Sequence, residues 1–341
     1  FVEDNIKKFK LLDKTDDYLD PIFLVGFPRS GTTLLDTILR SHSKTVVLEE
    51  RYSRVDNNPS ALLSEQINAS LFMNHPYRKP IIGWEHEIKN LKLEDVMSFY
   101  KKFYAPNNAI IVISGDVTLD QVVKIAKKHF GPIGPSKIEE RLWTEEPTQH
   151  APRVVILKSE NTAIPFFKRH YLVPTYTKSK KESIALQVFT EIFGNPSTGM
   201  LFDEFVKNKK IATSAVAYYY PDGFGDTNFT ISVVPKKGIT LNKIESELNT
   251  YLKEIKEKVI NKDELKSTKK RLVNETIFAQ DSLYMGMRIF GSSLSTGYSL
   301  KDIIDWSSDI QKVSLDDIQN ILSKIFDSNK SVTGLLLPID K

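Results

Sequence analysis

The sequence contains no cysteine, which narrows the chemistry open to this chain. Without thiols it forms no disulfide bond and has neither a thiolate metal ligand nor a cysteine nucleophile. Long hydrophobic runs are also missing: the longest have the length of a strand, so no membrane-spanning helix is expected. Residues 1–20 are charged and show no signal peptide. We therefore expect a soluble protein, and the cytoplasm is favoured although the sequence does not specify a compartment.

The chain has little net charge for its length. Its 47 Lys and Arg residues against 43 Asp and Glu residues give +4 over 341 residues. The lysines occur as scattered pairs, such as Lys101-Lys102 and Lys127-Lys128, which is typical of solvated helix faces. We therefore expect no nucleic-acid partner. The length and an apolar fraction of 40% predict a folded protein of two domains with a substantial core.

Residues 91–117, LKLEDVMSFYKKFYAPNNAIIVISGDV, predict one helix followed by one buried strand. Pro106 ends the helix, and the apolar run Ala109–Ile113 has the length of a strand. Residues 313–338, VSLDDIQNILSKIFDSNKSVTGLLLP, repeat the register of apolar positions, turn and strand. We therefore predict an internal duplication and two related domains. In the first copy the inward helix residues would be Val96, Met97, Phe99, Tyr100 and Phe103.

The remaining patterns predict an α+β fold, with helices packed on a mainly antiparallel sheet. Strands are expected at 153–157 and 169–173, and a hairpin joins 214–220 to 228–234. Residues 282–312 read as a polar region that contains glycine, with no predicted element. Helices are expected at 44–54, 60–72, 119–130, 183–193, 200–207, 241–258 and 263–281. In the helix 119–130 the inward residues would be Val122, Val123, Ile125, Ala126 and Phe130.

Residues 21–42, PIFLVGFPRSGTTLLDTILRSH, are the sharpest local motif. A strand, a glycine-bounded loop and a helix N-terminus would direct backbone N–H groups and the helix dipole at an anion. The pair Gly26 and Gly31 has Walker spacing, but Thr32 stands where the phosphate-binding lysine belongs, which argues against a nucleoside triphosphatase.

The text FLVGFPRSGTTLL resembles the 5′-phosphosulfate loop of sulfotransferases that use phosphoadenosine phosphosulfate. The resemblance implies that the 5′-phosphate and sulfonate would be held by Arg29, Ser30, Gly31, Thr32 and Thr33. Glu49 or Glu50 would be the nearest candidates for a base. No downstream match to the family's 3′-phosphate residues is found, so a strand and helix kept only as a packing unit remain the alternative.

From residue 44 onward, four segments in order resemble the pitrilysin and mitochondrial-processing-peptidase family of zinc proteases: VVLEERYSRVDNNP, HPYRKPIIG, FYAPNNAIIVISGDV and FGPIG. Enzymes of this family are similar to inverzincins, in which H-x-x-E-H supplies two zinc ligands and a base, and a distant glutamate is the third ligand. The resemblance places Glu50 on that third ligand. It also implies paired subunits, with an Arg and a Tyr from a second domain; Val206 and Thr213 stand in those two places here.

None of the six histidines forms H-x-x-E-H. The zinc helix corresponds to residues 182–193 of the second copy, so its first-copy counterpart would precede Phe1. That place holds the sulfotransferase-like segment, and the junction lies near residues 42–44. We therefore divide the chain into a strand–loop–helix segment, an incomplete first domain, a linker and a second domain, at 1–43, 44–134, 135–151 and 152–341.

The leading interpretation is a divergent or truncated homologue of these zinc proteases, without peptidase activity of its own. No bound zinc is expected, and Glu50 would be a remnant ligand only. Such a chain would act as a partner or peptide-binding subunit, with a homologous protease-family subunit or through self-association. The alternative is a sulfotransferase or a phosphoadenosine phosphosulfate-binding protein using Arg29 to Thr33. A third interpretation is a chimera of two gene fragments with no selected activity.

Overall fold

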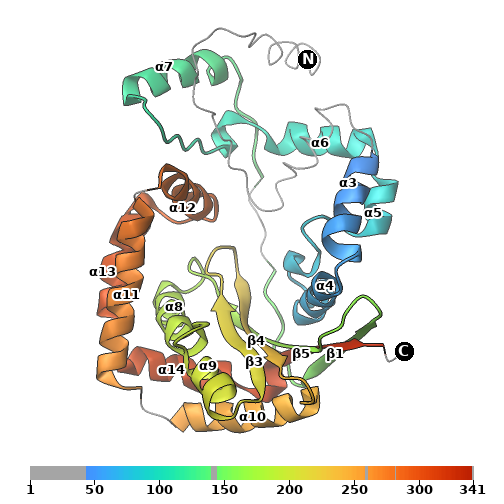
Figure 1. Cartoon of the computed structure of the whole chain (residues 1–341). Coiled ribbons are helices and arrows are strands. Elements are labelled where there is room, and N and C mark those ends of the chain that lie inside the picture. Colours follow the sequence, from blue (N-terminus) through green and yellow to red (C-terminus); the bar gives the residue numbers. More distant parts are fainter. Residues whose placement is uncertain (1–43, 140–143, 258–259, 281, 340–341) are drawn as a thin grey trace.

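The structure is a computed structural model, and it describes residues 44–139, 144–257, 260–280 and 282–339 (Figure 1). The sulfotransferase-like segment 21–42 lies outside the described residues.

A five-stranded sheet with the order β1-β5-β2-β4-β3 forms the centre of the second half. Strand β1 pairs parallel with β5, and the pairs β5–β2, β2–β4 and β4–β3 are antiparallel. The predicted α+β fold with a mainly antiparallel sheet is therefore confirmed, including the hairpin. The strands are β1 (Arg153–Ser159), β2 (Phe166–Pro174), β3 (Ala212–Tyr219), β4 (Asp226–Pro235) and β5 (Ser331–Pro338).

One face of this sheet is covered by helices and holds the larger core. Alternation along β2 turns Phe167, Tyr171 and Val173 into this core, where none is more than 3% exposed. Phe189 and Phe193 of α8 stack on each other in this core. Their neighbours are Phe229 of β4 and Phe326, which follows α14. The covering elements are α8 (Lys180–Gly194), α9 (Met200–Phe202), the π-helical η4 (Asp203–Asn208), α10 (Leu241–Glu257), α11 (Lys262–Gln280) and α14 (Leu315–Ile325).

The structure adds two helices that the sequence patterns missed, α12 (Leu283–Ser295) and α13 (Leu300–Lys312). Residues 282–312 are therefore not an irregular polar region. Helix α13 begins with a capping box, in which Ser299 and Asp302 satisfy each other's backbone N–H groups. Its Ile310 is fully buried and Trp306 packs at the core margin, while the rest of the helix is more exposed.

The opposite face of the sheet is covered by α4 (Pro59–Leu71), a helix from the first half of the chain (Figure 1). Pro59 fills the first helical position, and the Asn58 side chain accepts the N–H groups of Ser60 and Ala61. Apolar residues at steps of four then face β1 and β5 and form one buried cluster: Leu63, Ile67, Leu71, Phe72, Val332 and Leu336. Gly334 allows this close approach, because a Cβ there would lie 2.1 Å from Cδ1 of Ile67.

The first copy of the duplicated unit differs from its second copy. In the second copy the expected helix and strand both form: α14 buries Ile318, Leu322 and Ile325, and β5 lies between β1 and β2. In the first copy α6 (Leu93–Phe103) and α7 (Leu119–Phe130) form, but Ala109–Ile113 pairs with no strand among the described residues.

Three expectations for the first copy were therefore wrong. The strand at 109–113 is absent; Val96 is the only buried residue of α6; and α7 has none, so its residues predicted as inward are half-buried or exposed. Spacing shows which helix face can be buried, but burial needs a neighbouring sheet, and the described residues provide none here. Figure 1 shows α6 and α7 at the far end of the molecule from α10 and α14.

The chain between these elements forms short helices and turns. They are α3 (Lys44–Arg51), the π-helical η1 (Tyr52–Asp56), η2 (Pro76–Arg78), α5 (Glu85–Asn90), η3 (Pro106–Asn108) and η5 (Ser328–Lys330). The described residues from Gly131 to Ala151 contain no helix or strand, as expected of a linker. The division of the chain into domains stays a prediction.

Substituting Ile67→Ala should lower the free energy of unfolding by about 2–5 kcal/mol, since Ile67 is fully buried between α4 and Gly334. The matched control is Leu119→Ala on α7, where the side chain is 77% exposed and a change within about 0.5 kcal/mol is expected. Urea unfolding of both variants measures the difference. Equal losses in the two variants would contradict the α4 packing described here.

Candidate functional site

Arg51 holds the segment that carries the predicted site residues Glu49 and Glu50. It is 5% exposed and ends α3. One nitrogen, Nη1, donates to Glu65 Oε2 of α4 at 2.9 Å and to the carbonyl of Gly83 at 2.8 Å. The other, Nη2, donates to Glu65 Oε1 at 3.2 Å and pairs with Asp56 Oδ1 at 3.0 Å. The hydrogen bond with Glu65 raises the pKa of Arg51 against the effect of burial.

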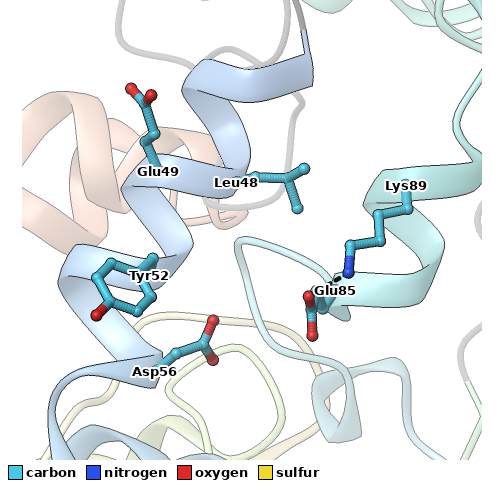
Figure 2. A pocket seen from close by; sticks show the side chains of 6 residues that line it. All are labelled: Leu48, Glu49, Tyr52, Asp56, Glu85 and Lys89. Carbon is cyan, nitrogen blue, oxygen red and sulfur yellow. Dashed lines mark hydrogen bonds and ion pairs between the residues drawn. The ribbon is translucent and has the colours of Figure 1, made fainter.

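A shallow pocket of about 320 Å³ lies between α3 and α5 (Figure 2). It is lined by Leu48, Glu49, Tyr52, Asp56, Glu85 and Lys89. Lys89 donates to Glu85 at 2.5 Å, and this hydrogen bond lowers the pKa of the Glu85 carboxyl group. In Figure 2 Glu49 and Glu85 come from facing helices and point away from each other. The pocket therefore presents carboxylates to solvent without joining them at one point.

Glu50, the expected remnant of a metal site, lies outside this pocket's lining. Its Oε1 pairs with Nε of Arg54 at 3.2 Å, one helical turn away. Among the described residues no three His, Asp or Glu side chains are grouped so that they could hold a metal ion. His75 and His170 are buried in other parts of the fold, and His86, His129 and His150 are exposed. The described residues do not fit a zinc site, so no catalytic step through a metal is derived.

A loop from the first half docks on the β3–β4 hairpin of the second half. The loop is also held by the linker, where the carboxylate of Glu146 accepts the backbone N–H groups of Met73 at 2.7 Å, Asn74 at 2.8 Å and His75. Tyr77, in η2, accepts the Phe224 N–H with its hydroxyl oxygen at 2.9 Å. The sequence marked HPYRKPIIG as a family segment, but nothing in it indicated this contact with the hairpin.

The hairpin turn is glycine-rich where the loop meets it. Gly225 has φ +75°, and a Cβ there would lie 3.1 Å from Nε2 of His75. Gly223 has φ +143°, with a Cβ position 3.0 Å from the Tyr77 hydroxyl. Both glycines therefore serve the close contact as well as the turn.

The two second-half positions of the expected Arg and Tyr carry no such groups. Val206 is half-buried and packs at the margin of the core. Thr213 is exposed at the start of β3, and its Oγ1 donates to the carbonyl of Val234 at 3.3 Å. Val206 has no side-chain donor, and the Thr213 hydroxyl bonds to the neighbouring strand, so neither takes the place of Arg or Tyr. The loop residues Arg29, Ser30, Gly31, Thr32 and Thr33 lie outside the described residues, so their role stays a prediction.

Two protein-family profiles match this chain. A family profile described as "Peptidase M16 inactive domain" matches residues 90–272, more than half of the chain. The chain belongs to this family. A second profile, described as "Sulfotransferase family", matches residues 21–109. That match includes the glycine-bounded loop but also α3 to α6, which are built here as part of the M16-like fold.

Known relatives of this M16 chain are zinc proteases and homologues that lack peptidase function by name. The zinc protease PqqE of Helicobacter pylori is 25% identical over 86% of the chain and 66% of its own length. The non-peptidase homolog YmxG of the same organism is 22% identical over 75% of the chain and 58% of its own length. The crystal structure of a protease from Helicobacter pylori shares the fold, with a TM-score of 0.78 at 24% identity, over 86% of this chain and 70% of that one.

The chain spans less than two thirds of the length of these two sequence relatives. Within the part that the structure describes, no helix is long and apolar enough to cross a membrane.

Substituting Arg51→Met should lower the free energy of unfolding by about 3–5 kcal/mol, because Glu65 would remain buried as an unpaired charge. The double variant Arg51→Met with Glu65→Met should regain most of this loss, since no buried charge is left. Denaturant titrations of the wild type, both single variants and the double variant give the coupling energy. A double variant no more stable than Arg51→Met alone would disprove this account of the pair.

Proposed function

We propose that this chain is a non-catalytic M16 family member that acts as the partner or peptide-binding subunit of a homologous protease-family protein. The observation that carries the proposal is the absence, among the described residues, of any acidic or histidine group that could hold zinc. Val206 and Thr213, in the places of the substrate-binding pair, support the same conclusion. The relative YmxG carries the name of a non-peptidase homolog, in keeping with a family that includes such proteins.

The surface of the first half supports a partner subunit. Large apolar side chains are exposed on the first half, and three of them, Phe99, Val123 and Ile125, were predicted to face inward. The set is Leu93, Phe99, Ile110, Val117, Leu119, Val123 and Ile125. Leu119 is 77% exposed and Leu93 is 61% exposed. Exposed apolar side chains that gather into one patch mark interaction sites on soluble proteins, and we propose that these residues form part of such a site. The partner would be a homologous subunit or a second copy of this chain.

The isolated chain should contain no stoichiometric zinc and should show no chelator-sensitive peptide cleavage. Elemental analysis of the purified chain and cleavage of a mixed peptide library, with and without chelator, test both statements. A metal-to-protein ratio near one together with chelator-sensitive cleavage would overturn the proposal.

Partner binding should be weakened by Leu119→Glu, which places a charge in the exposed apolar surface of α7. Leu300→Glu on α13 is the matched control, since Leu300 is 56% exposed in the second half. The measurement is complex formation, by light scattering, with an M16 subunit that carries an intact H-x-x-E-H motif. A loss of at least tenfold in affinity for the α7 variant alone is expected. Equal affinity of both variants would exclude this surface as the contact.

A second candidate function rests on one observation, the sulfotransferase family profile that matches residues 21–109. On this alternative, Arg29 to Thr33 would hold the phosphates of phosphoadenosine phosphosulfate. Calorimetric titration of the full chain with phosphoadenosine phosphate tests it, with Arg29→Ala as the variant and the exposed Arg54→Ala as the control. Binding that Arg29→Ala abolishes and Arg54→Ala leaves unchanged would support the alternative, and no binding would remove it.

A further inference from the structure

The sheet surface under α4 is polar where β2 crosses it. Because Phe167, Tyr171 and Val173 face the larger core, the alternate residues of β2 face α4. Phe166 and Leu172 pack at the edge of the α4 cluster, and between them stand Lys168 and His170. His170 is 4% exposed, opposite Thr230 of β4 and Val332 of β5. The α4 interface thus joins an apolar end on β1 and β5 to a polar end on β2.

The polar end of this interface is incompletely satisfied. Neither Nδ1 nor Nε2 of His170 has a hydrogen-bond partner among the described residues, and Oδ1 of Asn68 in α4 has none either. Lys168 reaches α4, where its Nζ donates to Ser64 Oγ at 2.8 Å. The same Nζ lies 5.3 Å from the centre of the Phe166 ring. Buried polar atoms without partners cost stability, so α4 is held more weakly here than over β1.

In the part of the chain that the structure describes, no carboxylate of the elements packed around His170 balances a charge on its ring. The neighbouring positions of β4 and β5 carry Asn228, Thr230, Ser232, Val332 and Gly334. The acidic residue of α4, Glu65, is bonded to Arg51. The remaining ionisable groups are Lys168 on β2, Arg153 on β1, which donates to the carbonyl of Ser70, and the phenol of Tyr218 on β3. An imidazolium at this place would meet cations and no counter-ion.

We propose that α4 is an acid-released cover of the sheet: uptake of a proton by His170 loosens α4 from β2 and exposes the sheet beneath it. With α4 in place, burial and the adjacent Lys168 ammonium hold His170 neutral. Once α4 lifts away, water reaches the imidazole, which can then carry the charge. Protons therefore bind the open form better than the closed form, and acid shifts the population toward the open form.

The direction and size of the effect follow from the two states. Burial, reinforced by Lys168, lowers the pKa of His170 from 6.5 to about 3 in the closed form. A base with a lowered pKa favours the closed form fully above pH 6.5 and progressively less as the pH falls toward 3. If the open form has the ordinary pKa, the opening constant rises about fourfold at pH 6 and about thirtyfold at pH 5.

Hydrogen–deuterium exchange of the full chain between pH 7.5 and pH 5 tests this proposal. After correction for intrinsic rates, amides of α4 should open about thirtyfold more at pH 5, and amides of α8 in the larger core should not change. In His170→Leu the α4 response should fall to twofold or less. His129→Gln, at an exposed residue of α7, is the control and should keep the full response.

Two outcomes would overturn the proposal. One is an unchanged pH response in His170→Leu, which would assign it to other groups, such as the buried His75. The other is equal loosening of α8, which means global unfolding. A second measurement does not depend on any variant: the NMR titration of His170 in the wild-type chain. Its imidazole should stay neutral at pH 5 in the closed form, and titration near pH 6.5 without opening would contradict the proposal.

Discussion

The burial of α4 against β1 and β5 is the contact on which the arrangement of the first half depends. Leu63, Ile67 and Val332 are fully buried there, and the missing side chain of Gly334 lets the helix approach. Arg51 is then fixed through Glu65 of α4, and it holds the end of α3 and the Gly83 turn in place. A helix from the first half therefore completes the hydrophobic layer of a sheet that belongs to the second half.

The strands of the second half could be predicted from the sequence, because each strand pattern finds a neighbouring strand within the chain. Val332 to Leu336 read as a strand and have β1 and β2 beside them. The run Ile110–Ser114, which the repeat aligns with Val332–Leu336, is also mostly apolar, yet no paired strand lies beside it in the described part. Local pattern sets what a segment can become, and a strand also needs a neighbour to bond its backbone. The α4 contact could not be predicted, since helical spacing identifies an apolar face but not the sheet that it covers.

For the candidate site, too, the sequence shows which residues are present but not which of them contact each other. That no H-x-x-E-H motif occurs in residues 1–341 is visible in the sequence. The structure alone shows that Glu50 pairs with Arg54. It also shows that Arg51, at the end of α3, is buried against Glu65. Consecutive charged residues on a helix point in different directions, and the sequence does not say which one turns inward. Helices α12 and α13 were not predicted, although the sequence carries the Ser299–Asp302 capping box with which α13 begins.

The larger core and the segment around the α3–α5 pocket depend on different contacts. The larger core is built from phenylalanines of α8, β4 and the end of α14, and none of them touches Glu50 or the α3–α5 pocket. In the first half, apolar side chains such as Leu93 and Leu119 face solvent instead. Each apolar side chain that a partner removes from water contributes roughly 1.5–3 kcal/mol before the costs of association. For the proposed partner subunit, the exposed apolar surface of α6 and α7 is therefore where binding would gain free energy.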